Sequence, residues 1–106
     1  MAGIEMTSTV FLHAIRACFA ASGGFALEEL RTRPWSSRNF RGSRHELAFR
    51  LEGAAANQAA DRFLAEMHRS APELPGQILA SLSLLAEERR PGCARIRIEA
   101  LTVEPG

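Results

Sequence analysis

The residues best suited to chemistry lie between Arg31 and Arg44, in a segment with five arginines and no acidic residue. Planar guanidinium groups match two oxygens of a phosphate or carboxylate, and the aromatic rings between them can stack on a base or a cation. The composition of this segment predicts a loop that binds an anionic ligand or a protein partner. Its candidate ligand-binding residues are Arg33, Trp35, Arg38, Phe40, Arg41, Arg44 and His45. The alternative is a solvated connection whose Trp35 and Phe40 fold back onto the core.

Histidine and cysteine chemistry has less support. His45 lies on the inward phase of an expected strand, where an imidazole could be a ligand, a proton carrier or a structural residue. The two cysteines lack CxxC spacing, no Cys–His signature or nucleophile elbow occurs, and buried thiols in a reducing cytoplasm are expected. We therefore predict no catalytic residue, metal site or cofactor. The ligand types considered, none of them in HxxxH or CxxC spacing, are His13, His45, His68, Cys18, Cys93 and Asp61.

The composition describes one ordinary globular domain over residues 1–106. At 46% hydrophobic and 24% charged residues, the chain can bury one core but not two. Its net charge is +1, so a charged partner must be recognised by a local patch. All 13 basic residues are arginine, which is typical of a GC-rich bacterial genome. No apolar run approaches the ~20 residues of a membrane span, and residues 1–9 lack a signal-peptide pattern, so a cytoplasmic protein is expected.

Hydrophobic periodicity predicts the elements that must position these residues. The clearest strand covers 44–52, where His45, Leu47, Phe49 and Leu51 alternate with polar residues or alanine. Segment 77–89 is ambiguous between helix and strand. The turn signal Arg90-Pro91-Gly92 and the alternation that follows it favour a hairpin. We expect helices at 8–22 and 55–69, and strands at 25–34, 44–52, 77–88 and 94–104.

These elements form two α-β-β units and an α+β fold. The simplest packing is a four-stranded antiparallel sheet with both helices on one face, which is a circularly permuted ferredoxin-like order with 44–52 and 94–104 in the centre. An offset of fifty-two residues aligns apolar positions of the halves, which indicates an internal repeat of 8–53 and 60–105 or a coincidence. The later apolar phase at Leu101 and Val103 predicts a bulge or burial on both faces.

The second face of this sheet would mix charges with apolar residues. Exposed leucines there are unfavourable in a monomer, so we predict a homodimer that buries this face. The expected residues are Arg44, Glu46, Ala48, Arg50, Leu79, Ser81, Ser83, Leu85, Arg95, Arg97, Glu99, Leu101 and Val103.

Three functional classes fit the sequence. The preferred one is a small binding or regulatory protein that holds an anionic ligand or a protein partner. The second is RNA or single-stranded nucleic-acid binding through segment 31–44, against which the near-neutral charge counts. The third is a small enzyme with a pocket between sheet and helices, for which no catalytic constellation is present.

Overall fold

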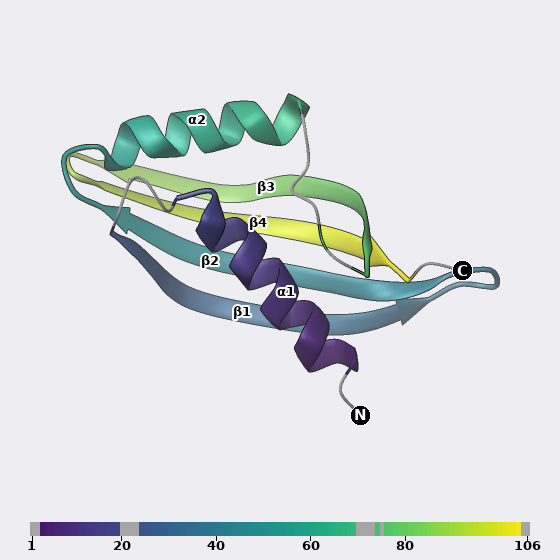
Figure 1. Ribbon diagram of the computed structural model, residues 1–106. Helices are drawn as coiled ribbons and strands as arrows, with labels where there is room; N and C mark the ends of the chain where they lie inside the picture. The colour runs from purple at the N-terminus through teal and green to yellow at the C-terminus, as the bar shows by residue number, and fades with distance from the viewer. Residues whose placement is uncertain (1–2, 20–23, 70–73, 75, 105–106) are drawn as a thin grey trace.

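The computed structural model describes residues 3–19, 24–69, 74 and 76–104. It contains two helices and a four-stranded antiparallel sheet, which confirms the α+β class (Figure 1). The ambiguous segment 77–89 is a strand. No helix in the described ranges is both long and apolar enough to cross a membrane. The elements are α1 (Gly3–Ala17), β1 (Phe25–Ser36), β2 (Arg41–Glu52), α2 (Ala56–Arg69), β3 (Ile78–Arg90) and β4 (Cys93–Val103).

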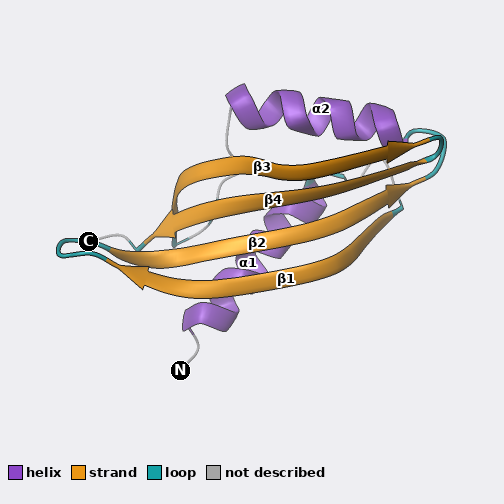
Figure 2. Ribbon diagram, turned by 180° about the vertical axis from the view of Figure 1, so that it is seen from behind, coloured by secondary structure: helices purple, strands orange, loops and turns teal. Residues whose placement is uncertain are grey.

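The strands are arranged in the order β1-β2-β4-β3, with the two most regularly alternating strands in the centre. Both helices pack on the same face, α1 against β1 and β2, and α2 against β2, β4 and β3. We call the other side of the sheet the open face, and it is turned to the viewer in Figure 2.

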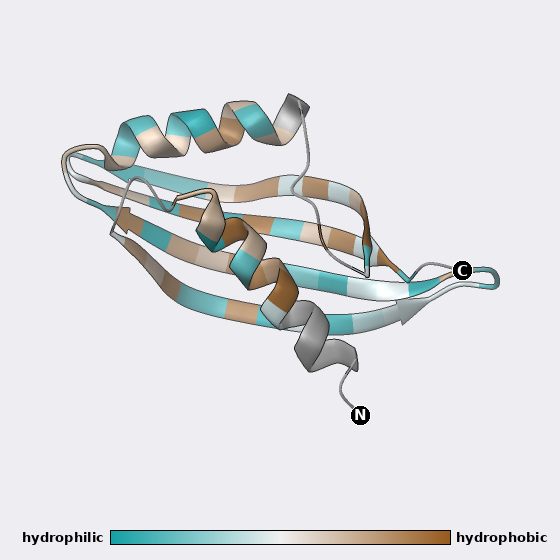
Figure 3. Cartoon of the chain, in the orientation of Figure 1, coloured by the Kyte–Doolittle hydropathy of each residue, from teal (hydrophilic) through white to brown (hydrophobic). Residues whose placement is uncertain are grey.

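The core lies between the helices and the inner face of the central strands. Leu47 is paired with Ile98 and Phe49 with Ile96, and all four side chains are buried. Alternation along β2 and β4 therefore separates apolar from charged side chains, as the colour bands in Figure 3 show. From the helices, the core receives Phe11, Ile15, Ala56, Ala59, Ala60 and Phe63.

The hairpin of β1 and β2 is longer than predicted, and this changes the meaning of the arginine-rich segment. β1 continues to Ser36 and β2 begins at Arg41, so the predicted loop is two strands joined by a turn at residues 37–40. β1 is an edge strand, where Pro34 can lack a backbone N–H without loss of a sheet hydrogen bond. The prediction of a loop over 31–44 was wrong because the strand signal is weak in a polar edge strand.

The bounds of α1 also differ from the prediction. The helix begins at Gly3 rather than Ser8 and ends at Ala17, followed by a turn at Cys18 and Phe19. The rest of the predicted helix, to Ser22, falls on residues outside those the structure describes. In the turn, Cys18 N–H donates to the Ile15 carbonyl and Phe19 N–H to that of Arg16, each at 3.0 Å.

Bulges lie in the edge strands and not where the sequence pattern suggested. The register shifts between Leu27 and Glu29 in β1, and twice in β3, whereas β2 and β4 pair without interruption up to Val103. The bulge predicted near Leu101 is therefore wrong. Leu101 and Val103 lie on the open face, and the inner positions beside them are Ala100 and Thr102.

Candidate anion-binding site on the open face

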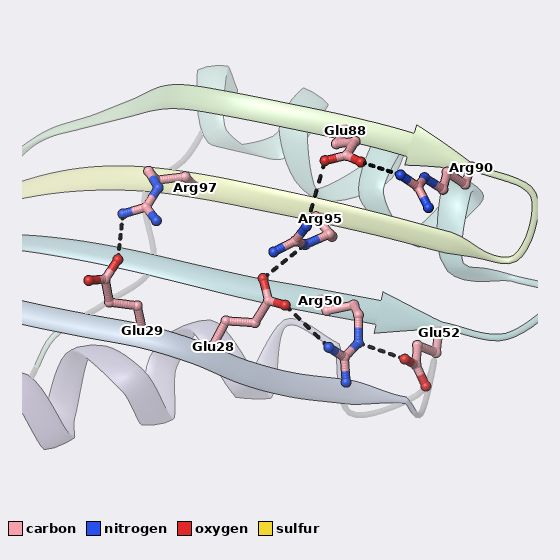
Figure 4. A network of polar contacts seen from close by, with 8 residues as sticks. All are labelled: Glu28, Glu29, Arg50, Glu52, Glu88, Arg90, Arg95 and Arg97. Atoms are coloured by element: carbon pink, nitrogen blue, oxygen red, sulfur yellow. Dashed lines mark hydrogen bonds and ion pairs between the residues drawn. The ribbon is translucent and has the colours of Figure 1, made fainter.

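Ion pairs between arginine and glutamate side chains occupy the part of the open face away from the β1–β2 turn. Arg97 contacts Glu29 at 2.8 Å and Arg95 contacts Glu28 at 3.1 Å (Figure 4). Arg97 also contacts Glu46 at 3.2 Å. The hydrogen bond from Arg97 lowers the pKa of the Glu29 carboxyl. Because glutamates already neutralise Arg95 and Arg97, these two arginines attract an anionic ligand only weakly.

The bulge in β1 explains how this network forms. Adjacent residues of a regular strand point to opposite faces, so in an uninterrupted strand Glu28 and Glu29 would point apart. At the bulge, the extra residue allows both carboxylates to contact open-face arginines, Glu28 with Arg50 and Arg95, and Glu29 with Arg97.

Near the turn of the β1–β2 hairpin, the arginine side chains are less closely paired with acidic groups. Arg33 is directly opposite Arg44 in the strand register, and like charges in such a pair repel. Arg44 comes no closer than 3.8 Å to its ion-pair partner Glu99, and Arg33 has no ion pair within the described part of the chain. Neighbouring Arg31 is held by Glu29 at 2.9 Å. A hollow of about 270 Å³ is lined by Arg31, Arg33, Arg44, Glu46 and Glu99.

Trp35 occupies the next row of the open face. It pairs with Gly42, and a Cβ at that glycine would lie 3.0 Å from Trp35 Nε1 and would overlap the carbonyl oxygen of Thr102. Glycine therefore allows the indole to lie against the sheet. Trp35 is half-buried, and its Nε1 is buried with no hydrogen-bond acceptor among the described residues.

Three further predicted residues, Arg38, Phe40 and Arg41, lie in the turn or directly after it. Ser37 N–H donates to the Phe40 carbonyl at 2.8 Å, and Phe40 N–H donates to Ser37 Oγ at 3.2 Å. These bonds fix the turn, yet the Phe40 side chain stays 58% exposed. Arg38 and Arg41 are exposed and have no ion pair among residues that the structure describes. The turn borders a hollow of about 540 Å³ that also includes Ile78 and Val103.

His45 lies on the opposite side of the sheet from the arginine pair. Its ring is 0% exposed, stacks on Phe11 with centroids 5.0 Å apart, and lies 2.9 Å from Thr32 Oγ1 and 3.3 Å from Thr102 Oγ1. Because Thr102 Oγ1 donates its hydrogen to the Ser43 carbonyl, it accepts a hydrogen bond from His45 Nε2–H, and the unprotonated Nδ1 accepts a hydrogen bond from the Thr32 hydroxyl. Burial lowers the pKa of His45 to about 4, so the ring is neutral at pH 7.

The structure thus divides the predicted site residues into three groups. Arg33, Trp35 and Arg44 share the open face, Arg38, Phe40 and Arg41 surround the turn, and His45 is in the core. Three further residues that line the hollow, Arg31, Glu46 and Glu99, were not predicted as site residues. The signal that could have identified Arg31 is its two-residue spacing from Arg33, which places both on one face of the strand expected at 25–34.

Thiol and metal chemistry has no centre in the described residues. Cys18 is exposed in the turn after α1, contrary to the expected burial, because the helix ends before its apolar stripe reaches this position. Cys93 is half-buried at the start of β4, and both thiols are free. Among the described residues, no three His, Cys, Asp or Glu side chains are grouped for a metal ion. The candidate side chain of His68 lies outside those described.

The chain matches no protein-family model, no curated protein and no solved structure. Its function is therefore inferred from its own geometry.

Proposed function

We propose that this protein is a non-catalytic binding module that holds an anionic group on the open face, between Arg33 and Arg44. One observation carries the proposal: these two arginines face each other without close acid partners, whereas Arg50, Arg95 and Arg97 each contact glutamate within 3.2 Å. We also infer a circularly permuted ferredoxin-like topology, supported by the element order and by the strand order β1-β2-β4-β3.

The physical reason is the repulsion within this weakly compensated pair. Like charges directly opposite each other on two strands are destabilising. An anion between the two guanidinium groups replaces that repulsion with charge-assisted hydrogen bonds, which are worth about 1.5–3 kcal/mol each. Phosphate and carboxylate both present the pair of oxygens that a guanidinium group recognises.

Replacement of both arginines tests the proposal. In isothermal titration calorimetry with inorganic pyrophosphate, the variant Arg33→Gln with Arg44→Gln is expected to bind about 10- to 100-fold more weakly than the unaltered protein. Without ligand, the variant should be equally stable or slightly more stable, because a repulsive pair is removed.

The matched controls alter arginines away from the site. Arg90 lies at the far end of the open face, 3.1 Å from Glu88 with its side chain 74% exposed, and Arg62 is exposed on α2. The double control Arg62→Gln with Arg90→Gln should leave pyrophosphate affinity nearly unchanged. An equal loss in both double variants would indicate a general charge effect and would reject the site.

We further propose that two copies associate through the β4–β3 half of the open face. Its support is apolar surface: Ile78 is 54% exposed and is paired with half-buried Val103, and half-buried Leu101 lies two residues away along β4. Farther along β3, Leu85 is 44% exposed. The patch is smaller than the sequence indicated, because a bulge turns Leu79 toward the core. Arg95 and Arg97, the neighbouring cations, are already paired with glutamate.

Light scattering after size exclusion tests this association. We expect a dimer at micromolar concentration and a monomer for Leu101→Glu, whereas Leu27→Glu, a matched change at a 40% exposed leucine of β1, should remain dimeric. A monomer of 11.6 kDa for the unaltered protein would exclude the dimer.

A further inference from the structure

We propose that the anionic ligand is a single-stranded nucleic acid that follows the β1–β2 hairpin from the Arg33–Arg44 pair, over Trp35, to the turn at Phe40. The inference rests on the proposed anion site and extends it by naming the class of ligand. The aromatic rings of Trp35 and Phe40, with arginines around them, favour a nucleic acid over other anions because bases can stack on the rings.

The hairpin alternates cations and rings along its length. On the open face, the row of Arg33 and Arg44 is followed by the row of Trp35 and Gly42, and the turn with Arg38 and Phe40 comes next. Single-strand binding proteins combine positive charge that follows the phosphates with aromatic side chains on which bases stack. Along this hairpin, arginines that can contact phosphates and rings that can stack on bases follow one another in a single line.

Trp35 is positioned as a stacking platform. The indole lies over Gly42, where no side chain separates it from the sheet, and it keeps a partly exposed surface beside the arginine pair. A ring supported in this way has little freedom to lose when a base stacks on it, and rigid aromatic groups bind at low entropic cost.

Phe40 is a second ring held away from the core. Leaving a phenylalanine exposed forfeits roughly 1.5–3 kcal/mol of burial, and two hydrogen bonds with Ser37 nevertheless fix the turn that presents it. Arg38 and Arg41, both exposed, flank the ring in the sequence. A base on Phe40 would therefore have cations near its phosphates.

The near-neutral net charge of the chain does not exclude nucleic-acid binding, because the basic residues are unevenly distributed. Segment 31–44 holds five of the 13 basic residues and none of the 12 acidic ones, so the rest of the chain has eight basic and twelve acidic residues. A polyanion is attracted to the hairpin and repelled elsewhere. Net charge therefore underestimates the local attraction.

The single tryptophan makes the test specific. The chain has one tryptophan and no tyrosine, so its intrinsic fluorescence above the phenylalanine range comes from Trp35. Oligouridylate and oligothymidylate of about 12 nucleotides, within known site sizes, are expected to quench this fluorescence and to bind more weakly as salt rises. Oligoglutamate of the same charge should bind at least 10-fold more weakly and leave the fluorescence unchanged.

Ring variants separate stacking from charge. By fluorescence anisotropy of labelled oligonucleotide, Trp35→Leu and Phe40→Ser should each lower affinity roughly 5- to 100-fold, while calorimetry shows pyrophosphate affinity unchanged. Leu84→Ser, at a 40% exposed apolar residue outside both the hairpin and the proposed dimer patch, is the control and should have no effect on either probe. Phe40→Ser alters only an exposed side chain, so it remains informative if Trp35→Leu fails to fold.

The outcomes distinguish the two proposals. If pyrophosphate binds through Arg33 and Arg44 but oligonucleotides bind no better than oligoglutamate, the nucleic-acid inference is wrong and the anion site stands. If oligonucleotides bind and the Arg33→Gln, Arg44→Gln variant binds them equally well, the anion site is wrong. If neither probe binds, both proposals are rejected.

Discussion

Replacing Phe49 by alanine is expected to lower the free energy of unfolding by about 3–5 kcal/mol. Phe49 is 0% exposed in β2, and its ring centroid lies 5.2 Å from Phe19, 5.1 Å from Phe25 and 5.9 Å from Phe63. The ring therefore joins the turn after α1, the edge strand β1 and helix α2. Since small domains are stable by only about 5–15 kcal/mol, this loss is a large share of the total.

Urea denaturation followed by far-ultraviolet circular dichroism measures the effect. The matched control is Phe40→Ala, the same chemical change at a 58% exposed position, which should alter stability by no more than about 0.5 kcal/mol. Similar losses of unfolding free energy in the two variants would show that the packing of Phe49 against Phe19, Phe25 and Phe63 is not central to the core.

Acidification from pH 7 to pH 4 is expected to remove up to about 3 kcal/mol of stability through His45 alone. Burial lowers the pKa of this ring from 6.5 to about 4, so between these values the unfolded chain binds a proton that the folded chain excludes. Stability is therefore fully present above pH 6.5 and is lost as the pH falls toward 4. The described contacts of the ring are hydroxyl groups and Phe11, which give the imidazolium no compensating negative charge.

Measurement of unfolding free energy at several pH values, in the unaltered protein and in His45→Gln, isolates this contribution. The variant should be less stable at pH 7 but should show a much smaller change between pH 6.5 and pH 4. Protonation of Glu29, whose pKa is lowered by its hydrogen bond from Arg97, acts in the same direction only below its ordinary value of 4.5. An unchanged slope in the variant would show that other groups control acid stability.

Local sequence patterns were sufficient for the type and order of the elements, although not for all of their bounds. The alternation of His45, Leu47, Phe49 and Leu51 predicted a strand with one buried face. The turn signal at Pro91 and Gly92 correctly predicted that the preceding segment, 77–89, is a strand. Element order and alternation placed β2 and β4 in the centre. Such patterns are legible because side-chain periodicity and turn chemistry act over a few residues.

Strand register and the positions of bulges depend on how separate segments pair with each other, and no short sequence pattern encodes that pairing. A bulge sets both Glu28 and Glu29 on the open face, and another turns Leu79 inward. The internal repeat stays a prediction, although its offset aligns Phe49, which faces the helices, with Leu101 on the open face.

By itself, the sequence determined that arginines and aromatic residues gather in segment 31–44 and that the chain folds as an α+β domain. Only the tertiary structure decided which arginines of the chain have a close acid partner. Arg97 and Arg95 are neutralised by glutamates of β1 and β2 far away in sequence, whereas Arg33 meets Arg44 across the strands. The reason is physical: a charge is compensated by what lies within a few ångströms in space, and strand pairing, not sequence proximity, sets those neighbours.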